Sequence, residues 1–340
     1  MPLTLEEIGK LAGVSRSTVS RVVNGSANVS EVVRERVGQV IHQTGYHPHA
    51  AARSLVTHRT RVIGVVIPEA LTKLFTDPFF PLLLRGVTET CNSHDYHLML
   101  SLFSGPDGQF DMHRRVIRSG YLDGVIMAST RLDDPLVARL LQDKVALVMV
   151  GRHPDERVNY VDTDNLGAAR MATEHLIRLG HKKIATLTGP LNMLQAQDRV
   201  AGFRQAMDAH RYSLPESLVV EGDFTEGSGY EGMTRLLAVR PSAVFAASDA
   251  MAVGALKAIR HAGLRVPDDI ALVGFDDVPI AEAIEPALTT VRQPIERLGS
   301  MATELLLTLI EAGSSEEPRL VQRIVLPAEL IVRQSCGALR

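Results

Sequence analysis

Short apolar runs alternate with helical stretches along most of the chain beyond residue 61, and this alternation restricts the possible folds more than any other feature of the sequence. Buried strands separated by helices form parallel sheets whose faces the helices cover. We therefore expect an α/β fold, built either as one large sheet or as two similar lobes. The predicted strands cover residues 62–67, 97–102, 124–128, 146–150, 183–187, 218–221, 243–246 and 271–274.

The size and composition of the chain exclude several classes of protein. Its 340 residues exceed one ordinary core, because single cores stop growing at about 250–300 residues. Hydrophobic residues make up 45% and charged residues 22% of the chain, which excludes global disorder. Cys91 and Cys336 provide no disulfide framework, and the sequence has neither a secretory signal nor an apolar run of membrane-spanning length. We expect a cytoplasmic protein without a membrane segment.

The N-terminal region has the pattern of a helix-turn-helix. Thr4 and Glu7 are spaced as a capping box, in which each side chain accepts a hydrogen bond from the other residue's backbone N–H. Gly13 can adopt the left-handed conformation that ends this first helix, and Ser15 can cap a second one. An amphipathic third segment at 30–44 can close a small core.

The second of these helices has residues suited to a recognition helix that contacts DNA bases. In a helix-turn-helix its N-terminal end enters the major groove, where Arg16 or Arg21 can pair with guanine and Ser17 with a base or phosphate. Residues 1–61 contain eight Lys/Arg and four Asp/Glu, a charge of +4, which leaves −7 for the remainder. A basic head on an acidic body is typical of a phosphate-binding module. The alternatives are chance clustering on a solvated face and a helical hairpin that binds protein.

Two segments of this region carry a family resemblance, AGVSRSTVSRVVNG at 12–25 and GYHPHAAARSL at 45–55. They resemble the headpiece and hinge of the lactose-repressor (LacI/GalR) family. The resemblance implies a headpiece at 1–47 that reads double-stranded operator DNA, and a hinge helix and linker at 48–60. It also implies that the hinge helix inserts Leu55 into the minor groove as a wedge.

The resemblance implies DNA-contacting residues in both the headpiece and the hinge. Three alanines at 50–52 favour a helix, yet the segment is too short to be stable alone, so we expect it to fold on DNA. His49 departs from the family, whose members commonly carry Asn there. The implied DNA-binding residues are Thr4, Ser15, Arg16, Ser17, Thr18, Arg21, Asn24, His49, Ala52, Arg53 and Leu55.

For the rest of the chain the resemblance implies a core of two doubly wound parallel-sheet lobes, like that of periplasmic binding proteins. Its ligand would bind in the cleft between the lobes, at the carboxyl ends of the strands. The implied core is 61–340, with lobe one at 62–161 and 293–321, and lobe two at 162–292 and 322–335, including a strand near 323–333.

The residues at the predicted strand ends suit a sugar, because Arg, Asp and Gln bind vicinal hydroxyls and an aromatic ring covers the apolar face. Resemblance to ribose-type receptors places Phe80 and Phe224 against the sugar ring and four polar side chains on its hydroxyls, namely Arg152, Arg199, Asp276 and Gln293. The full implied set is Asp77, Phe79, Phe80, Arg152, Asp164, Arg199, Phe224, Ser248, Asp249, Asp276 and Gln293.

Some of these positions have other interpretations. Gly151 stands where an acid often precedes the Arg, and Ser248 where Asn is common, so the pocket or its sugar can differ from the family pattern. Asp249 could instead cap a helix at 250–262. Arg152 could form a surface ion pair.

Motifs for cofactors, metals and catalysis are absent or unconvincing. Residues 227–232 spell G-x-G-x-x-G, but the first Gly lies six residues beyond Glu221, and Asp223 and Glu226 would repel a pyrophosphate. The twelve histidines lack metal-ligand spacing. No motif joins a nucleophile to a base. We expect no cofactor, no metal and no enzymatic activity.

The sequence thus predicts a transcriptional regulator, most simply a repressor, controlled by a mono- or disaccharide. Two headpieces on a pseudo-palindromic operator require a homodimer. A purine or nucleoside effector stays open, since Phe224 would stack a base as readily as a sugar. A sugar-binding protein of a transport system and an α/β enzyme acting on a sugar or nucleotide are alternatives from other classes. The headpiece and the missing signal peptide argue against the transport protein.

Overall fold

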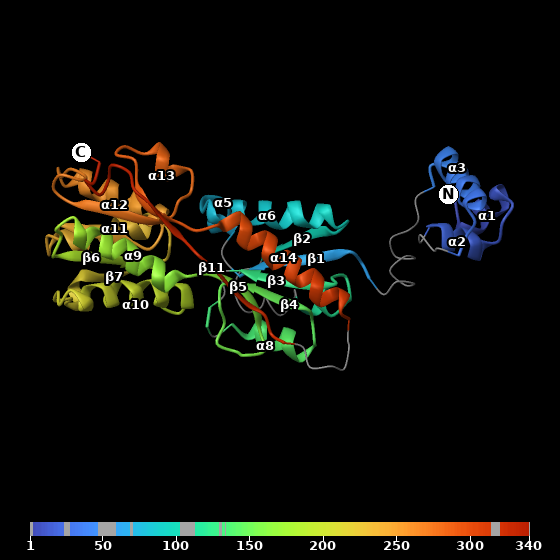
Figure 1. Ribbon diagram of the computed structural model, residues 1–340, viewed down its shortest axis with the longest axis horizontal. Helices are drawn as coiled ribbons and strands as arrows, with labels where there is room; N and C mark the ends of the chain where they lie inside the picture. The colour runs from blue at the N-terminus through green and yellow to red at the C-terminus, as the bar shows by residue number, and fades with distance from the viewer. Residues whose placement is uncertain are drawn as a thin grey trace. The chain divides into compact units, whose positions relative to one another are not determined.

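The computed structural model divides into two compact units, Met1–Arg61 and Val62–Arg340 (Figure 1). Each unit is considered by itself. The structure describes residues 3–23, 28–46, 59–68, 71–102, 113–128, 131–132, 134–313 and 320–339. The predicted hinge at 48–60 lies outside the described residues except for its last two positions.

The N-terminal unit is a three-helix domain. Its helices are α1 (Leu5–Ala12), α2 (Arg16–Val23) and α3 (Glu31–Thr44). They enclose a small core to which every helix contributes, formed by Ile8, Ala12, Val19, Val37 and Tyr46. The predicted helix-turn-helix is confirmed.

Local sequence signals determine where these helices begin and end. The Glu7 backbone N–H donates to the Thr4 hydroxyl at 3.3 Å, and the Thr4 backbone N–H donates to the Glu7 carboxylate at 2.7 Å. Gly13 ends α1 with a φ of 66°. A Cβ atom on Gly9 would lie only 2.8 Å from the Val14 carbonyl oxygen, so this glycine lets the turn fold back onto α1.

The larger unit contains two six-stranded sheets, which define lobe one and lobe two (Figure 1). The order in lobe one is β11-β5-β4-β3-β1-β2, with all pairs parallel. The order in lobe two is β12-β10-β9-β8-β6-β7, and only β12 runs antiparallel to its neighbour. The strands of lobe one are β1 (Val62–Ile67), β2 (His97–Leu102), β3 (Gly124–Ala128), β4 (Leu147–Val150), β5 (Asn159–Thr163) and β11 (Arg323–Leu326). Those of lobe two are β6 (Ile184–Thr188), β7 (Val219–Glu221), β8 (Ala243–Ala246), β9 (Ala271–Asp276), β10 (Thr289–Arg292) and β12 (Glu329–Ile331).

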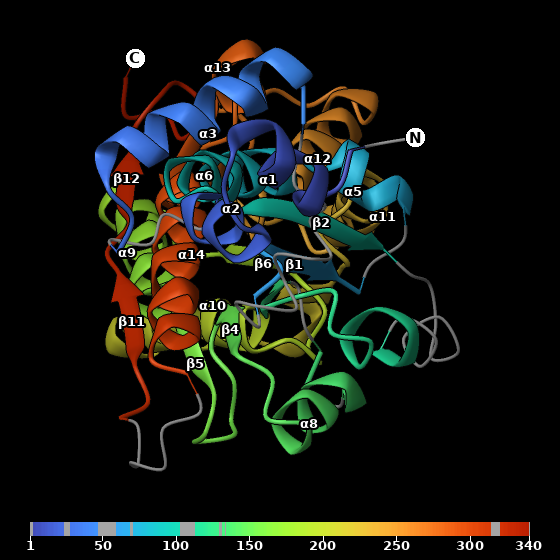
Figure 2. The same ribbon diagram turned by 90° about the vertical axis from the view of Figure 1, so that its right-hand side faces the viewer.

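Helices cover both faces of each sheet, as buried parallel strands require (Figures 1 and 2). Val65 of β1 packs in the core beneath α6 and α14, whereas Val66 packs in the core beneath α8. Among the described residues, no helix is both long and apolar enough to cross a membrane. The helices of lobe one are α5 (Leu71–Thr76), α6 (Phe79–Ser93), α8 (Pro135–Gln142) and α14 (Ile295–Glu311), with a π-helix at His113–Ile117. Those of lobe two are α9 (Asn165–Arg178), α10 (Leu194–Ala209), α11 (Glu226–Leu237), α12 (Asp249–His261) and α13 (Ile280–Ala283), with a 3-10 turn at Glu216–Leu218.

All eight predicted strands are present, but the sequence patterns missed β5 and β10, which carry polar residues at their ends.

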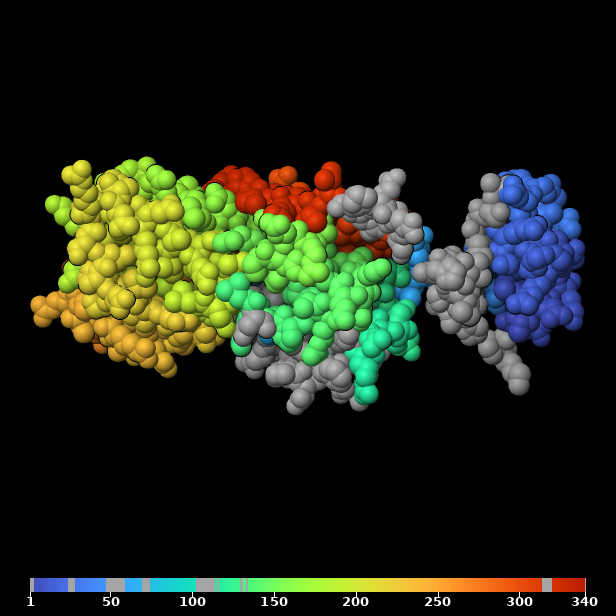
Figure 3. All heavy atoms as spheres, turned by 90° about the horizontal axis from the view of Figure 1, so that it is seen from below, coloured from blue at the N-terminus to red at the C-terminus, as the bar shows by residue number. Residues whose placement is uncertain are grey.

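The chain crosses between the lobes three times, after β5, after β10 and after β11. We expected the segment of β11 in lobe two, and this assignment is wrong. It pairs with β5 of lobe one, and only β12 joins lobe two. Figure 3 shows the C-terminal residues, in red, against the green residues of lobe one.

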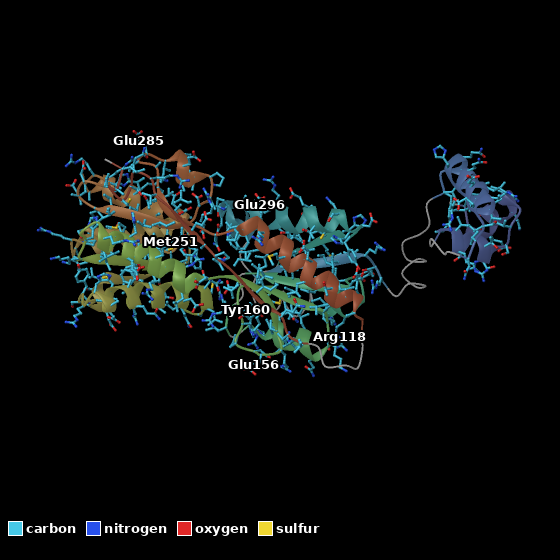
Figure 4. All side chains as sticks on the ribbon, viewed as in Figure 1. Arg118, Glu156, Tyr160, Met251, Glu285 and Glu296 are labelled. Atoms are coloured by element: carbon cyan, nitrogen blue, oxygen red, sulfur yellow. The ribbon has the colours of Figure 1, made fainter. Side chains whose placement is uncertain are left out.

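Glycines allow neighbouring helices to approach closely. A Cβ on Gly86 of α6 would overlap the carbonyl oxygen of Glu296 at the start of α14, which is labelled in Figure 4. A Cβ on Gly229 of α11 would overlap the backbone of Met251 on α12, labelled in the same view. Gly229 belongs to the G-x-G-x-x-G motif, so this glycine serves helix packing.

Gly86→Ala is therefore expected to destabilise the larger unit, because the added methyl forces α6 and α14 apart. The free energy of unfolding should fall by roughly 1–3 kcal/mol, the usual cost of overpacking, measured by urea denaturation. Gly227→Ala is the matched control, since that helical glycine is exposed and has open space around it. An equal effect of both substitutions would contradict the packing argument.

Candidate binding pocket and nucleic-acid interface

A cavity of about 620 Å³, part of it open to solvent, lies between the lobes of the larger unit. Its walls come from the carboxyl ends of strands in both sheets and from the helices that follow them. Open α/β sheets bind ligands at this edge. The lining residues are Asp77, Phe79, Phe80, Val150, Gly151, Asp162, Asn165, Gln195, Arg199, Phe224, Ser248, Asp276, Gln293 and Leu298.

Arg199 of α10 is the buried cation of this cavity, and its side chain is only 6% exposed. Its Nε–H donates to Asn165 Oδ1 at 2.9 Å, and its Nη1–H donates to the Ala247 carbonyl oxygen at 2.5 Å. The guanidinium carbon lies 3.6 Å from the centre of the Phe275 ring, and Nη1 lies 3.8 Å from an Asp276 oxygen. A buried charge needs such compensation. These contacts hold the guanidinium in one position.

Asp276 links this cation to the other lobe. Its Oδ1 accepts a hydrogen bond from Gln293 Nε2 at 2.5 Å, and Gln293 Oε1 accepts one from the Thr163 hydroxyl at 3.1 Å. Burial raises the pKa of Asp276 to about 7, although the charge of Arg199 opposes this rise. A continuous polar chain therefore runs from lobe two to Thr163 at the end of β5 in lobe one.

Asp162 lies at the base of the lobe-one wall. Its Oδ1 accepts hydrogen bonds from the Thr163 backbone N–H at 2.8 Å and from Asn165 Nδ2 at 3.1 Å. Its Oδ2 accepts one from the Arg152 backbone N–H at 3.2 Å. Burial raises the pKa of Asp162 to about 6. Asn165 thus joins the Asp162 carboxylate to the Arg199 guanidinium.

Aromatic rings reach the cavity from both lobes. Phe79 and Phe80 stand edge to face with ring centres 5.5 Å apart at the start of α6. Phe224 has a φ of 69°, unusual for a residue with a side chain, and a Cβ on Gly189 would overlap its ring. Apolar faces combined with fixed donors and acceptors suit a polyhydroxylated ring, which has one apolar face and a polar edge.

The structure brings together eight of the eleven ligand-binding residues implied by the sequence. They come from six separate parts of the chain. These eight are Asp77, Phe79, Phe80, Arg199, Phe224, Ser248, Asp276 and Gln293. Their roles toward a ligand remain predictions.

The other three lie outside the cavity lining. Arg152 forms a two-point ion pair with Asp198 of α10, at 2.6 and 2.5 Å, so its guanidinium contacts the opposite lobe. Asp164 caps α9 by accepting a hydrogen bond from the Gly167 backbone N–H at 2.9 Å.

Asp249 is neither a cavity residue nor a helix cap. Ser248 caps α12 by accepting a hydrogen bond from the Met251 N–H, so Asp249 is the first residue inside the helix. Its buried carboxylate accepts hydrogen bonds from the Thr290 hydroxyl at 2.5 Å and the Val278 N–H at 3.0 Å. Burial raises the pKa of this carboxyl. Asp249 therefore ties α12 to β10.

The sequence interpretation missed several cavity residues. Asp162 lies in β5 and Asn165 follows this strand, which its polar composition concealed. Gln195 lies in the first turn of α10, one turn before Arg199, and helical spacing from Arg199 could have identified it. The remaining members are Val150, Gly151 and Leu298.

In the N-terminal unit, α2 presents an exposed polar face. Arg16, Ser17 and Arg21 are exposed. The Ser15 hydroxyl accepts a hydrogen bond from the Thr18 N–H at 3.2 Å and contacts the Ser17 and Thr18 hydroxyls at 2.8 and 2.9 Å. Thr4 belongs to the capping box of α1. The other implied DNA contacts lie outside the described residues, namely Asn24, His49, Ala52, Arg53 and Leu55.

Comparison with known proteins identifies both units. Residues 4–49 match the family of bacterial regulatory proteins named lacI, and residues 173–336 match the periplasmic binding protein-like domain. The chain is 43% identical over 342 residues to the HTH-type transcriptional regulator CelR of Thermobifida fusca, covering 98% of each chain. The chain belongs to the lacI family.

Solved structures of lacI-family proteins have the same architecture. A CelR–cellobiose complex is 40% identical, with a TM-score of 0.77 over 98% of this chain and 99% of that one. The lac repressor dimer bound to operator and the anti-inducer ONPF is 27% identical, with a TM-score of 0.86 over 99% and 100%. The lacI-family chain described here is therefore a DNA-binding transcriptional regulator, as the headpiece motifs implied.

Asp276→Asn should change how the stability of this lacI-family core depends on pH. The pKa of the native carboxyl is about 7, against an ordinary 3.8, so the native chain keeps a proton that the unfolded chain has lost. The stability contributed by this proton is fully present below about pH 4 and is lost as pH rises through 7. Asparagine cannot ionise. The urea midpoint of the variant should rise relative to that of the wild type between about pH 5 and about pH 8. A difference that does not vary with pH would contradict the assignment.

Proposed function

We propose that this regulator is a repressor whose operator affinity is controlled by an uncharged disaccharide such as cellobiose, bound in the interlobe cavity. The observation that carries the proposal is the pairing of aromatic faces from both lobes with the fixed Arg199, Asp276 and Gln293 groups. The CelR–cellobiose complex, 40% identical over nearly the whole chain, supports cellobiose as the probe of first choice.

The cavity provides each contact that a sugar needs. Phe80 and Phe224 cover the apolar faces of the ring, because both line the cavity from different lobes. Arg199 donates, Asp276 accepts and Gln293 does both, which matches the paired donor and acceptor character of vicinal hydroxyls. The proposed regulator acts by binding rather than by turnover, and it works in the cytoplasm, where its operator is.

Effector binding alters operator affinity only if the effector binds the two arrangements of the lobes unequally. Two features support this condition: residues of both lobes line the cavity, and the chain crosses between the lobes three times. A change in the angle between lobes would reach the hinge at 48–60 through β1, which follows the hinge directly in the chain. We infer that the hinge carries the signal to the headpiece.

A reciprocal pair of variants tests this function. Arg21→Ala should weaken operator binding by about tenfold or more, since a guanine-reading Arg contributes about 1–3 kcal/mol, while the affinity for cellobiose stays unchanged. Phe224→Ala should weaken cellobiose binding and leave operator affinity unchanged, because it removes a stacking face and leaves the headpiece intact. Fluorescence anisotropy with operator DNA and isothermal titration with cellobiose give both readouts. Catalytic conversion of the sugar, or loss of both affinities in either variant, would contradict the proposal. Adenine and hypoxanthine serve as controls for a purine effector.

A homodimer is part of the same proposal. Three exposed apolar side chains lie on α5, β2 and α13: Phe75, Leu100 and Ile280, with exposed fractions of 75%, 38% and 37%. Helices α5 and α13 both lie on the upper side of the larger unit in Figures 1 and 2, and β2 is one of the two edge strands of the described sheet in lobe one. The lac repressor structure is a dimer on its operator. An edge strand and exposed apolar side chains on this side of the unit suit pairing with a second copy.

Phe75→Asp should therefore convert the dimer into a monomer of 37.0 kDa, because it places a charge in the apolar interface. Sedimentation velocity measures the change. Val325→Asp is the matched control, since Val325 is 53% exposed on β11 at the opposite edge of the same sheet. A Val325→Asp variant that sediments as a monomer, or a Phe75→Asp variant that stays dimeric, would place the interface elsewhere.

A further inference from the structure

We infer that the cavity selects uncharged sugars and rejects their phosphate esters, because every cation at the described cavity is already neutralised by contacts within the chain. This inference rests on the proposed function and specifies the chemical class of the effector. It assigns a specificity role to the Arg152–Asp198 ion pair, which lies outside the cavity lining.

Acidic groups outnumber basic groups in the cavity wall. Three carboxylates, those of Asp77, Asp162 and Asp276, face one guanidinium, that of Arg199, among the described lining residues. Burial raises the pKa of Asp276 to about 7, and the charge of Asp77 contributes to this rise. Burial likewise raises the pKa of Asp162, with a contribution from Asp198. A ligand phosphate would therefore bring further negative charge beside buried carboxyl groups that already share a single guanidinium.

The guanidinium of Arg199 is committed to contacts within the chain. It donates to Asn165 and to the Ala247 carbonyl oxygen, lies on the Phe275 ring and pairs with Asp276. A phosphate that displaced these partners would leave a buried carboxylate without its cation, which is strongly unfavourable. Sugar hydroxyls can share the same groups without disturbing the charge balance.

The second cation lies at the edge of the cavity and is also paired. Arg152 directly follows the lining residue Gly151, and its Nε and Nη2 donate to the two oxygens of Asp198 at 2.6 and 2.5 Å. Asp198 follows Gln195 and precedes Arg199 on α10, so the ion pair bridges the two lobes beside the cavity wall. This geometry leaves the Nε–Nη2 edge of the guanidinium occupied by a carboxylate, and this is one of the edges through which Arg binds phosphate in a bidentate way.

The segments that follow three strands of lobe one in the sequence contain acidic residues and no basic ones. The segments at 69–70, 103–112 and 129–130, which follow β1, β2 and β3 in sequence, contain three acidic residues and no Lys, Arg or His. Arg131 comes directly after the last of these segments, is exposed and does not line the cavity.

Isothermal titration of the full chain with cellobiose and with its 6′-phosphate tests the inference. We expect cellobiose to bind and the ester to bind at least about a hundredfold more weakly, since two or three like charges at close range oppose it. An ester that binds as tightly as cellobiose overturns the inference while leaving the proposed function intact. Failure of both ligands to bind overturns the proposed effector and this inference together, so the two failures are distinguishable.

Asp198→Asn tests the role of the ion pair. The substitution frees Arg152 beside the cavity, so affinity for the 6′-phosphate should rise by about tenfold or more, while affinity for cellobiose stays within about threefold. Asp155→Asn is the matched control, because it frees Arg157 from an ion pair that lies within lobe one and away from the cavity. Thermal unfolding verifies that both variants are folded. No gain in ester affinity, or an equal gain in the control, overturns the assignment to Arg152 and Asp198.

Discussion

The buried ion pair of Arg199 and Asp276 is the interaction on which the structure of the binding cavity depends. Both groups lose nearly all contact with water, and a charge removed from water must find its partners inside the protein. The partners come from several elements: Asn165 at the start of α9, Phe275 in β9 and Gln293 at the crossover after β10. The pair therefore fixes the positions of these elements relative to one another, and with them the walls of the cavity.

The same polar network connects the lobes. One branch runs from Arg199 through Asn165 to Asp162, and another from Asp276 through Gln293 to Thr163. Both branches end on the last residues of β5, beside the first chain crossover. A ligand that exchanges hydrogen bonds with this network acts on both lobes at once, which is the physical requirement for coupling an effector to a change in the angle between lobes.

Neutralisation of charge distinguishes this cavity from a general anion site. Among the described residues, Arg199 in the wall and Arg152 beside it are both engaged by carboxylates of the chain, Asp276 and Asp198. Specificity can thus arise from groups that contact no ligand, since Asp198 lies outside the lining and yet determines which partner Arg152 has. Sequence reasoning placed Arg152 either on the ligand or in a surface ion pair, and it did not identify Asp198 as the partner.

Local signals let the sequence by itself determine the helix-turn-helix, its capping box at Thr4 and Glu7, the strands of continuous apolar residues and the membership of the lacI family. These features depend on neighbours a few residues apart, or on long contiguous motifs, and both can be recognised in one dimension. Only the tertiary structure decided the pairing of β11 with β5, the burial of Asp249 against Thr290 and the ion pair between Arg152 and Asp198. Each of these joins residues more than forty positions apart, and the partner of a polar side chain at that separation is determined by which elements pack together.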